Sequence, residues 1–263
     1  MFFLSIPSKI FLSDRFIAAL LVLAALIQGS IFAAVFPPWQ APDETAHFQA
    51  VEMLVRLGRF AGWHDYGAIP LNREFVASLQ EHRFWQRRRI PPPSAQILAS
   101  QPAFRDLAGL SAPVNAENYP PLYYWILSFF YRLAPPLIEA KLYILRATSV
   151  VLLAAIVFMA WQTSKPLFAG DRLMAVSIPL MLIFLPMHIH INSAITTDVL
   201  AEFICTALFA VLMVGFKDGF SRVRLGLIIL LLMAGVYTKR TTFFTMPVAA
   251  GALVLYYARR MRS

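Results

Sequence analysis

A series of apolar segments, most of them close to the length of a membrane-spanning helix, constrains this chain more than any other feature. They cover residues 16–36, 140–162, 173–189, 195–216, 225–237 and 243–257. A helix needs about 20 apolar residues to cross a bilayer, and its backbone groups must bond within the segment. Only 14% of the residues are charged, whereas a soluble domain averages about a quarter. The sequence therefore predicts an all-α integral membrane protein with six spans.

A seventh apolar segment, residues 119–133, is unusually aromatic. Its amphipathic rings are Tyr119, Tyr123, Tyr124, Trp125 and Tyr131. Tyr and Trp favour the membrane–water interface, so this segment is predicted to be an interfacial or re-entrant helix. The chain then forms one membrane domain over residues 1–263, with a first span at 16–36, a long external loop with amphipathic helices at 37–118, and the remaining spans within 140–257.

The basic residues of the short loops fix the orientation of these spans. If 119–133 does not cross, all short basic segments fall on one side, which the positive-inside rule assigns to the cytoplasm. These residues are Lys9, Arg15, Lys165, Arg172, Lys217, Arg222, Arg224, Arg259, Arg260 and Arg262. Both termini are then cytoplasmic. The net charge of +9 fits contact with anionic lipid headgroups, and we expect no nucleic-acid partner.

The same orientation gathers polar residues at three turns on the outer face. The first turn holds Asp43, Glu44 and His47, the second His188, His190, Asn192 and Asp198, and the third Lys239 and Arg240. Ionisable groups near a bilayer are costly and are often functional. Ordinary loop polarity and ion pairing is the competing interpretation for any single residue. The coincidence of three such turns favours a site.

These residue types suit group transfer from a lipid-linked phosphate donor. A carboxylate can act as general base towards an incoming hydroxyl or amine, which makes Asp43 and Glu44 the candidate catalytic residues. Lys239 and Arg240 can hold a phosphate. The remaining predicted substrate contacts, including the aromatic ones that can lie along a lipid tail, are His47, His188, His190, Asn192, Asp198, Tyr123 and Tyr124.

Between the two adjacent acids, Asp43 is the stronger candidate. Pro42 presets a helix start, which predicts Asp43 in the first helical turn, where the helix dipole favours an ionised carboxylate. The competing interpretation is that Asp43 only caps an amphipathic helix lying on the membrane.

Four stretches of the chain resemble, in the same order, the GT-C-type membrane glycosyltransferases. They are "PPWQAPDETAHFQAVEMLVRLGRF", "NYPPLYYWILSFFYRL", "INSAITTDVLAEF" and "TKRTTFFTMPVAAGALVL". The chain is similar to bacterial membrane proteins related to the protein mannosyltransferases and the aminoarabinose transferases. This resemblance implies a polyprenyl-phosphate sugar as donor and a place in the bacterial inner membrane. It also implies Asp43 as the catalytic acid with Glu44 beside it, Asp198 as the second acidic position, and Lys239 as a phosphate-contacting base.

Two hypotheses follow, because members of that superfamily usually continue beyond this length and the resemblance covers their N-terminal module. The first is a glycosyltransferase acting on the outer face. The second is a non-catalytic membrane subunit or scaffold within a larger complex. A transporter is disfavoured, because the acids lie at helix ends and not at the midplane.

Metal use is left open by the sequence. The pairs Glu44/His47 and His188/His190 have spacings that metal ligands use, but no second Glu-x-x-His pair completes a di-iron pattern. We therefore predict no metal ligand. Related transferases differ in their use of Mg²⁺ or Mn²⁺, so the sequence leaves open whether the protein uses a divalent ion as cofactor.

Overall fold

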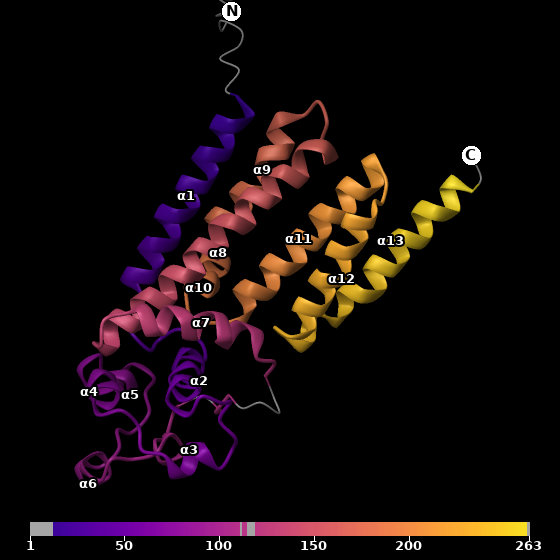
Figure 1. Cartoon of the computed structure of the whole chain (residues 1–263). Helices are drawn as coiled ribbons and strands as arrows, with labels where there is room; N and C mark the ends of the chain where they lie inside the picture. Colours follow the sequence, from indigo (N-terminus) through magenta and orange to yellow (C-terminus); the bar gives the residue numbers. More distant parts are fainter. Residues whose placement is uncertain (1–12, 111, 115–118, 262–263) are drawn as a thin grey trace, which may run out of the picture.

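Helices make up nearly all regular structure of this chain. The structure is a computed structural model that describes residues 13–110, 112–114 and 119–261, so Lys9 and Arg262 of the predicted basic ends lie outside the described residues. Within these ranges no β-strand forms, and the elements are helical throughout. Figure 1 shows two layers, a bundle of long helices and a layer of short helices at one end of it. The all-α prediction is confirmed.

The bundle contains the apolar segments. Its helices are α1 (Asp14–Val35), α8 (Ile138–Leu167), α9 (Arg172–Phe184), α10 (Pro186–Asn192), α11 (Thr197–Asp218), α12 (Arg222–Val236) and α13 (Thr245–Arg260). Within the described residues, four segments are long and apolar enough to cross a membrane: α1, α8, α11 and Arg240–Arg260, which joins the short 3₁₀-helix η2 (Arg240–Phe244) to α13. A fifth arises if α9 and α10 form one bent span.

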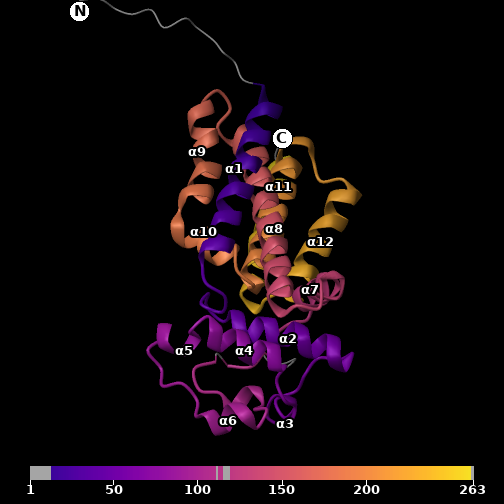
Figure 2. The same ribbon diagram turned by 90° about the vertical axis from the view of Figure 1, so that its left-hand side faces the viewer.

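The predicted count of six spans is therefore met only in part. The helix α12 has 15 residues, fewer than the roughly 20 that a span needs. It nevertheless runs alongside α11 and α13 in Figure 1 and contacts both of them, and Figure 2 shows it at the edge of the bundle. The helices α1 and α8 pack closely at Gly29, where an added Cβ would lie 2.9 Å from Cγ1 of Val150. Small residues allow this kind of approach between helices in membranes.

The break between α9 and α10 has a local cause. The two helices differ in direction by 62°, and Pro186 begins the second one. Proline has no N–H, so it cannot donate to the carbonyl of Leu182 four residues earlier. The Nδ1 atom of His188 lies 2.7 Å from that carbonyl oxygen and replaces the missing donor.

The layer of short helices is formed by the loop between α1 and the aromatic helix. It contains α2 (Glu44–Leu57), α3 (Asp65–Ala68), α4 (Arg73–Glu81), α5 (Phe84–Arg87), α6 (Ala95–Ala99) and the 3₁₀-helix η1 (Phe104–Asp106). Figure 1 places this layer at the end of the bundle opposite to the start of α1 and the end of α13. Buried aromatic residues such as Trp39, Phe48 and Phe75 form its core.

The aromatic segment forms α7 (Leu122–Leu133), which lies across the end of the bundle (Figure 1). At 1.5 Å per residue its 12 residues span about 18 Å, too little to cross the hydrocarbon layer. Tyr123, Tyr124, Leu127 and Tyr131 on one face are buried, and this face packs on α2. Trp125, Phe129 and Leu133, four residues apart, are exposed on another face. These features agree with the predicted interfacial helix.

Candidate functional site

A cavity lies where the short-helix layer meets the bundle. Its volume is about 150 Å³, and it is lined by Pro42, Asp43, His47, Tyr119, Ile191, Ala194, Thr196, Thr197, Asp198 and Lys239. These residues come from the first turn of α2 and the loop before it, the segment before α7, the end of α10 and the α10–α11 turn, the start of α11, and the segment between α12 and η2. This one cavity thus brings together Asp43, Asp198 and Lys239, which come from the three polar turns described above. The volume is below the roughly 300–1,000 Å³ of drug-sized pockets, so the cavity suits a single small group.

Asp43 has an unusual position for a helix-start acid. It is the N-cap of α2, with φ 54° and ψ 8°, and its side chain makes no capping bond. Asp43 was predicted to lie in the first helical turn. That prediction is wrong by one residue, because the helix begins at Glu44. A left-handed conformation is uncommon for a residue other than glycine, although Asp tolerates it better than most. The side chain is exposed and bonds to no other described residue, so its carboxylate is accessible from the cavity.

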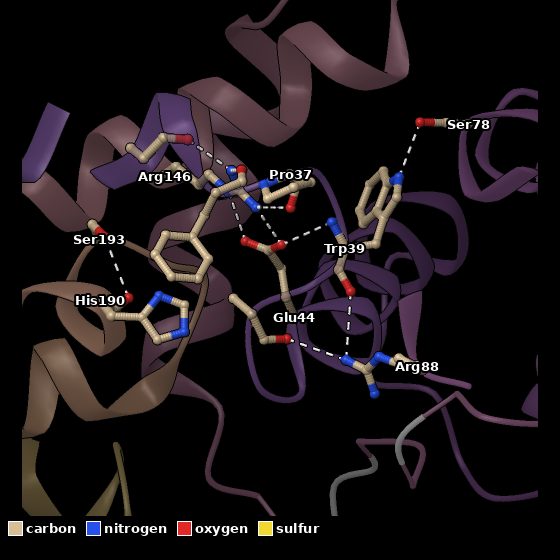
Figure 3. Close-up of polar contacts among 11 residues, drawn as sticks. Pro37, Trp39, Glu44, Ser78, Arg88, Arg146, His190 and Ser193 are labelled. Atoms are coloured by element: carbon tan, nitrogen blue, oxygen red, sulfur yellow. Dashed lines mark hydrogen bonds and ion pairs between the residues drawn. The ribbon is translucent and has the colours of Figure 1, made fainter. Parts of the chain in front are cut away.

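The neighbouring carboxylate, that of Glu44, is fully engaged. It is 0% exposed and pairs with Arg146 of α8, which is 1% exposed. Nε and Nη2 of Arg146 donate to the two carboxylate oxygens at 2.7 and 2.6 Å, and the backbone N–H of Trp39 donates to the same group at 3.1 Å. Figure 3 shows Glu44 held between Arg146 and Trp39. This geometry gives Glu44 a structural role, and we retain only Asp43 as candidate catalytic carboxylate.

Arg146 also completes the end of α1. Its Nη1 donates to the carbonyl oxygens of Ala33 and Phe36 at 2.7 and 2.8 Å, and Nη2 reaches that of Pro37 at 3.3 Å. The last carbonyls of a helix lack partners within the helix, and the two prolines after Phe36 cannot donate an N–H. One buried guanidinium therefore fixes the end of α1 and, through Glu44, the start of α2.

Arg88 holds the same loop from the side of the short-helix layer. Its Nη2 donates to the carbonyl oxygens of Trp39 and Ala41 at 3.4 Å (Figure 3). The indole Nε1 of Trp39 donates to Ser78 Oγ at 2.9 Å. Trp39 itself has a positive φ of 68°. These contacts hold in place the loop that presents Asp43 to the cavity.

His47 lies one turn along α2 from Asp43 and is 4% exposed. Its Nδ1 is 2.8 Å from the hydroxyl of Tyr124, and the ring of Tyr119 packs edge-on against it. The pKa of His47 is lowered from 6.5 to about 4, mainly by burial. Asp43 and Asp198 oppose this shift, and Lys239 contributes to it. The imidazole is therefore neutral at physiological pH.

Asp198 and Lys239 form an ion pair across the cavity wall. The hydroxyl of Thr196 caps α11 by accepting from the backbone N–H of Asp198 at 3.2 Å, and it donates to the Asp198 carboxylate at 3.1 Å. An ammonium has three hydrogens to donate, so Lys239 keeps donors for a ligand while it binds Asp198.

Several predicted substrate contacts lie away from this cavity. His188 and Asn192 both bind the carboxylate of Glu202, at 2.8 and 2.9 Å. The ring of His190 stacks on Phe36. We correct these three to residues that hold α10 against α11 and α1.

Tyr123 and Tyr124, which were predicted to contact the substrate, do not line the cavity. Tyr123 is fully buried, and Tyr124 reaches the cavity only through His47. Arg240 is exposed at the start of η2 and does not line the cavity.

Three residues that form or support the site were not predicted to do so from the sequence. Arg146 and Glu202 are charges inside apolar segments, and Tyr119 precedes the aromatic helix. An ionisable residue within a predicted span is a signal in itself, and it would have drawn attention to the first two. Among the described residues, no three His, Cys, Asp or Glu side chains gather closely enough to hold a metal ion.

Comparison of the chain with protein-family models, with curated proteins and with solved structures finds no match in any of the three. The geometry of this cavity is therefore the basis for a functional proposal.

Proposed function

We propose that this protein is a membrane glycosyltransferase of the GT-C type, which moves a sugar from a polyprenyl-phosphate donor to an acceptor. One observation carries the proposal. The carboxylate of Asp43 makes no capping bond to α2, is accessible, and shares a small cavity with Lys239 and Asp198. A carboxylate that can accept a proton, beside a cation that can hold a phosphate, suits transfer from a phosphate-linked donor. Of the predicted site residues outside the cavity, Glu44, His188 and Asn192 are bound to other side chains, so they do not compete with it as a site.

In the proposed transfer step, Lys239 stabilises the leaving phosphate and Asp43 accepts the proton of the acceptor. The acceptor oxygen or nitrogen forms a bond to the anomeric carbon of the sugar, and the bond between that carbon and the phosphate oxygen breaks. The electron pair of the broken bond stays on the polyprenyl phosphate, whose charge Lys239 stabilises. The proton of the acceptor passes to the carboxylate of Asp43. The cavity holds the phosphate group beside Lys239 and Asp43. The sugar and the acceptor lie at its mouth, and the lipid chain lies along the apolar surface of the bundle.

The proposal includes an orientation in the bacterial inner membrane, with six spans and both termini in the cytoplasm. The helices α11 and α13 both end at the side where α1 begins (Figure 1), which supports the proposal that the intervening α12 is a span. The short basic loops then lie inside. The cavity faces outward, where a lipid-linked donor in the outer leaflet can reach it.

Transfer by the purified protein in liposomes is the direct test, with a panel of polyprenyl-phosphate sugars and candidate acceptors. We expect one donor to support transfer. Asp43→Asn should lower the rate about 10²–10⁴-fold, as loss of a general base does, without loss of folded protein. The matched control is Asp218→Asn, since Asp218 is an exposed carboxylate at the other end of the bundle and should keep the wild-type rate.

Two results would reject the proposal. Asp43→Asn protein that transfers sugar at the wild-type rate would show that Asp43 is structural. Wild-type protein that transfers from none of the donors, yet co-purifies with a second membrane protein, would support the non-catalytic subunit instead.

A further inference from the structure

His47 presents an unused polar atom to the cavity. The side chain is 4% exposed, and it lines the cavity beside Asp43 and Lys239. Its Nδ1 is occupied by Tyr124, while its Nε2 bonds to none of the described residues. A side chain that is almost fully buried, lines a cavity and keeps one ring nitrogen without a protein partner points to a ligand.

The contact with Tyr124 decides which nitrogen carries the hydrogen. The phenol of Tyr124 is 0% exposed, and His47 Nδ1 is its only hydrogen-bond partner among the described residues. The buried hydroxyl must donate somewhere, so it donates to Nδ1, which accepts. A neutral imidazole has one hydrogen, and here that hydrogen is on Nε2. The atom that faces the cavity is thus a donor and cannot take a proton.

We propose that the Nε2–H of His47 and the ammonium of Lys239 together bind an anionic phosphate oxygen in this cavity, with Tyr124 as the residue that fixes the His47 tautomer. This inference deepens the proposed function, because the phosphate would be that of the lipid-linked donor. It assigns proton acceptance to Asp43 and anion binding to His47, although the two residues are one helical turn apart.

The charges around His47 permit an anion. The groups that face it are Asp43, Asp198, Lys239, Tyr119 and Tyr124. Asp198 is paired with Lys239 and bonded to Thr196, so the pair adds no net charge and Lys239 offers an anion its remaining N–H donors. Asp43 lies at the exposed rim, where solvent screens its charge. The N-terminus of the 22-residue helix α11 lies at the same wall and adds a positive dipole end.

Nuclear magnetic resonance of ¹⁵N-histidine in protein reconstituted in nanodiscs tests this inference without any assay of transfer. The His47 signals are assigned from a His47→Gln variant. We expect a neutral ring with hydrogen on Nε2 and not on Nδ1, down to pH values near 4. Added polyprenyl phosphate should shift the Nε2 signal, whereas the matching polyprenol without phosphate should leave it unchanged. Inorganic phosphate is a third arm and separates recognition of a free phosphate from that of a lipid headgroup. The exposed His64 is the internal control and should not respond.

Variants separate the binding role from a role in folding. His47→Gln retains an N–H donor and should bind polyprenyl phosphate close to normally, whereas His47→Phe should bind about 10- to 100-fold more weakly, as loss of a hydrogen bond to a charged group implies. Tyr124→Phe should give a mixture of His47 tautomers. Circular dichroism checks that each variant is folded. If His47→Phe proves unfolded, the inference is still tested by the His47 tautomer of the wild-type protein and by the shift of its Nε2 signal on addition of polyprenyl phosphate.

A His47 ring protonated on Nδ1, or positively charged at neutral pH, would overturn the inference. So would equal shifts with polyprenol and polyprenyl phosphate, or no shift with any phosphate. These results are distinguishable from failure of the proposed function. A protein that transfers sugar without a phosphate-dependent His47 shift refutes the inference alone, and one that binds phosphate without transfer refutes the enzyme alone.

Discussion

Arg146 and Glu44 join segments that are 102 residues apart, and they do so inside the protein. A buried ion pair contributes less to stability than its attraction suggests, because both charges lose their hydration. Here the pair adds five contacts to backbone or carboxylate oxygens. Its role is to define the loop from α1 to α2, which contains Trp39 and Asp43, both with positive φ.

At the residue scale, removal of one partner of this pair should strongly lower the stability of the protein. Arg146→Met leaves the Glu44 carboxylate buried without a cation, and we expect a loss of about 3–5 kcal/mol in the free energy of unfolding. Unfolding of the detergent-solubilised protein by denaturant, followed by circular dichroism, measures it. The control is Arg59→Met, which breaks an exposed ion pair with Asp65 and should change stability little. Equal effects of the two substitutions would contradict this account of Arg146.

Sequence reasoning identified the residues of the cavity better than it identified their roles. The orientation argument alone brought Asp43, Asp198 and Lys239 to one side. It could not tell that Glu44, next to Asp43, would point into the protein, because that depends on Arg146 in a distant helix. Side-chain partners of this kind are determined by tertiary packing, and helix periodicity or local spacing does not encode them.

At the scale of elements, α2 differs most from its expected form. The sequence pattern suggested an amphipathic helix on the membrane surface, yet residues 44–54 are buried without interruption. The polar residues among them have partners inside: Glu44 binds Arg146, His47 binds Tyr124, and Gln49 donates to Glu52 at 2.8 Å. The helix α7 packs on α2, and Phe48 of α2 stacks on Phe75 of α4. An amphipathic pattern therefore indicated internal polar contacts rather than a surface.

Glu52 gives α2 a measurable pH dependence. Burial raises its pKa above the usual 4.5, against the opposing effect of Gln49 and Arg56. The folded state then binds more protons than the unfolded state between the two pKa values, so this group makes the protein less stable as pH rises above 4.5.

Glu52→Gln removes that charge and keeps an oxygen to accept from Gln49. We expect the variant to be more stable than wild type at pH 7 and nearly equal to it below pH 4.5. Thermal unfolding in detergent at both pH values measures the difference. The exposed Glu74→Gln, in the first turn of α4, is the control and should show no gain at pH 7. Reduced stability of Glu52→Gln at pH 7 would mean that the charged form is favoured in the folded state.

At the scale of the whole molecule, apolar length and charge asymmetry predicted most of the arrangement. Every predicted apolar segment contains a helix, and the short basic loops lie at one end, where Asp14 pairs with Arg172 at 2.7 Å. The exceptions have local physical causes. Pro186 breaks the third segment into α9 and α10, and α12 is too short to be counted by length alone. Such interruptions depend on how neighbouring helices satisfy the freed backbone groups, as His188 does for Leu182.

Labelling of single cysteines with a membrane-impermeant maleimide in intact cells tests the six-span arrangement. The background is Cys205→Ser, and the three reporters are Ser100→Cys in the short-helix layer, Ser221→Cys before α12 and Thr241→Cys after it. All three positions are exposed, so access depends on the side of the membrane. Since α12 returns to the end that carries the cavity, we expect labelling at 100 and 241 from outside, and at 221 only after the cells are opened. Protection of residue 241 in intact cells, with labelling of 100, would mean that α12 does not cross, and Lys239 would then lack access to an external donor.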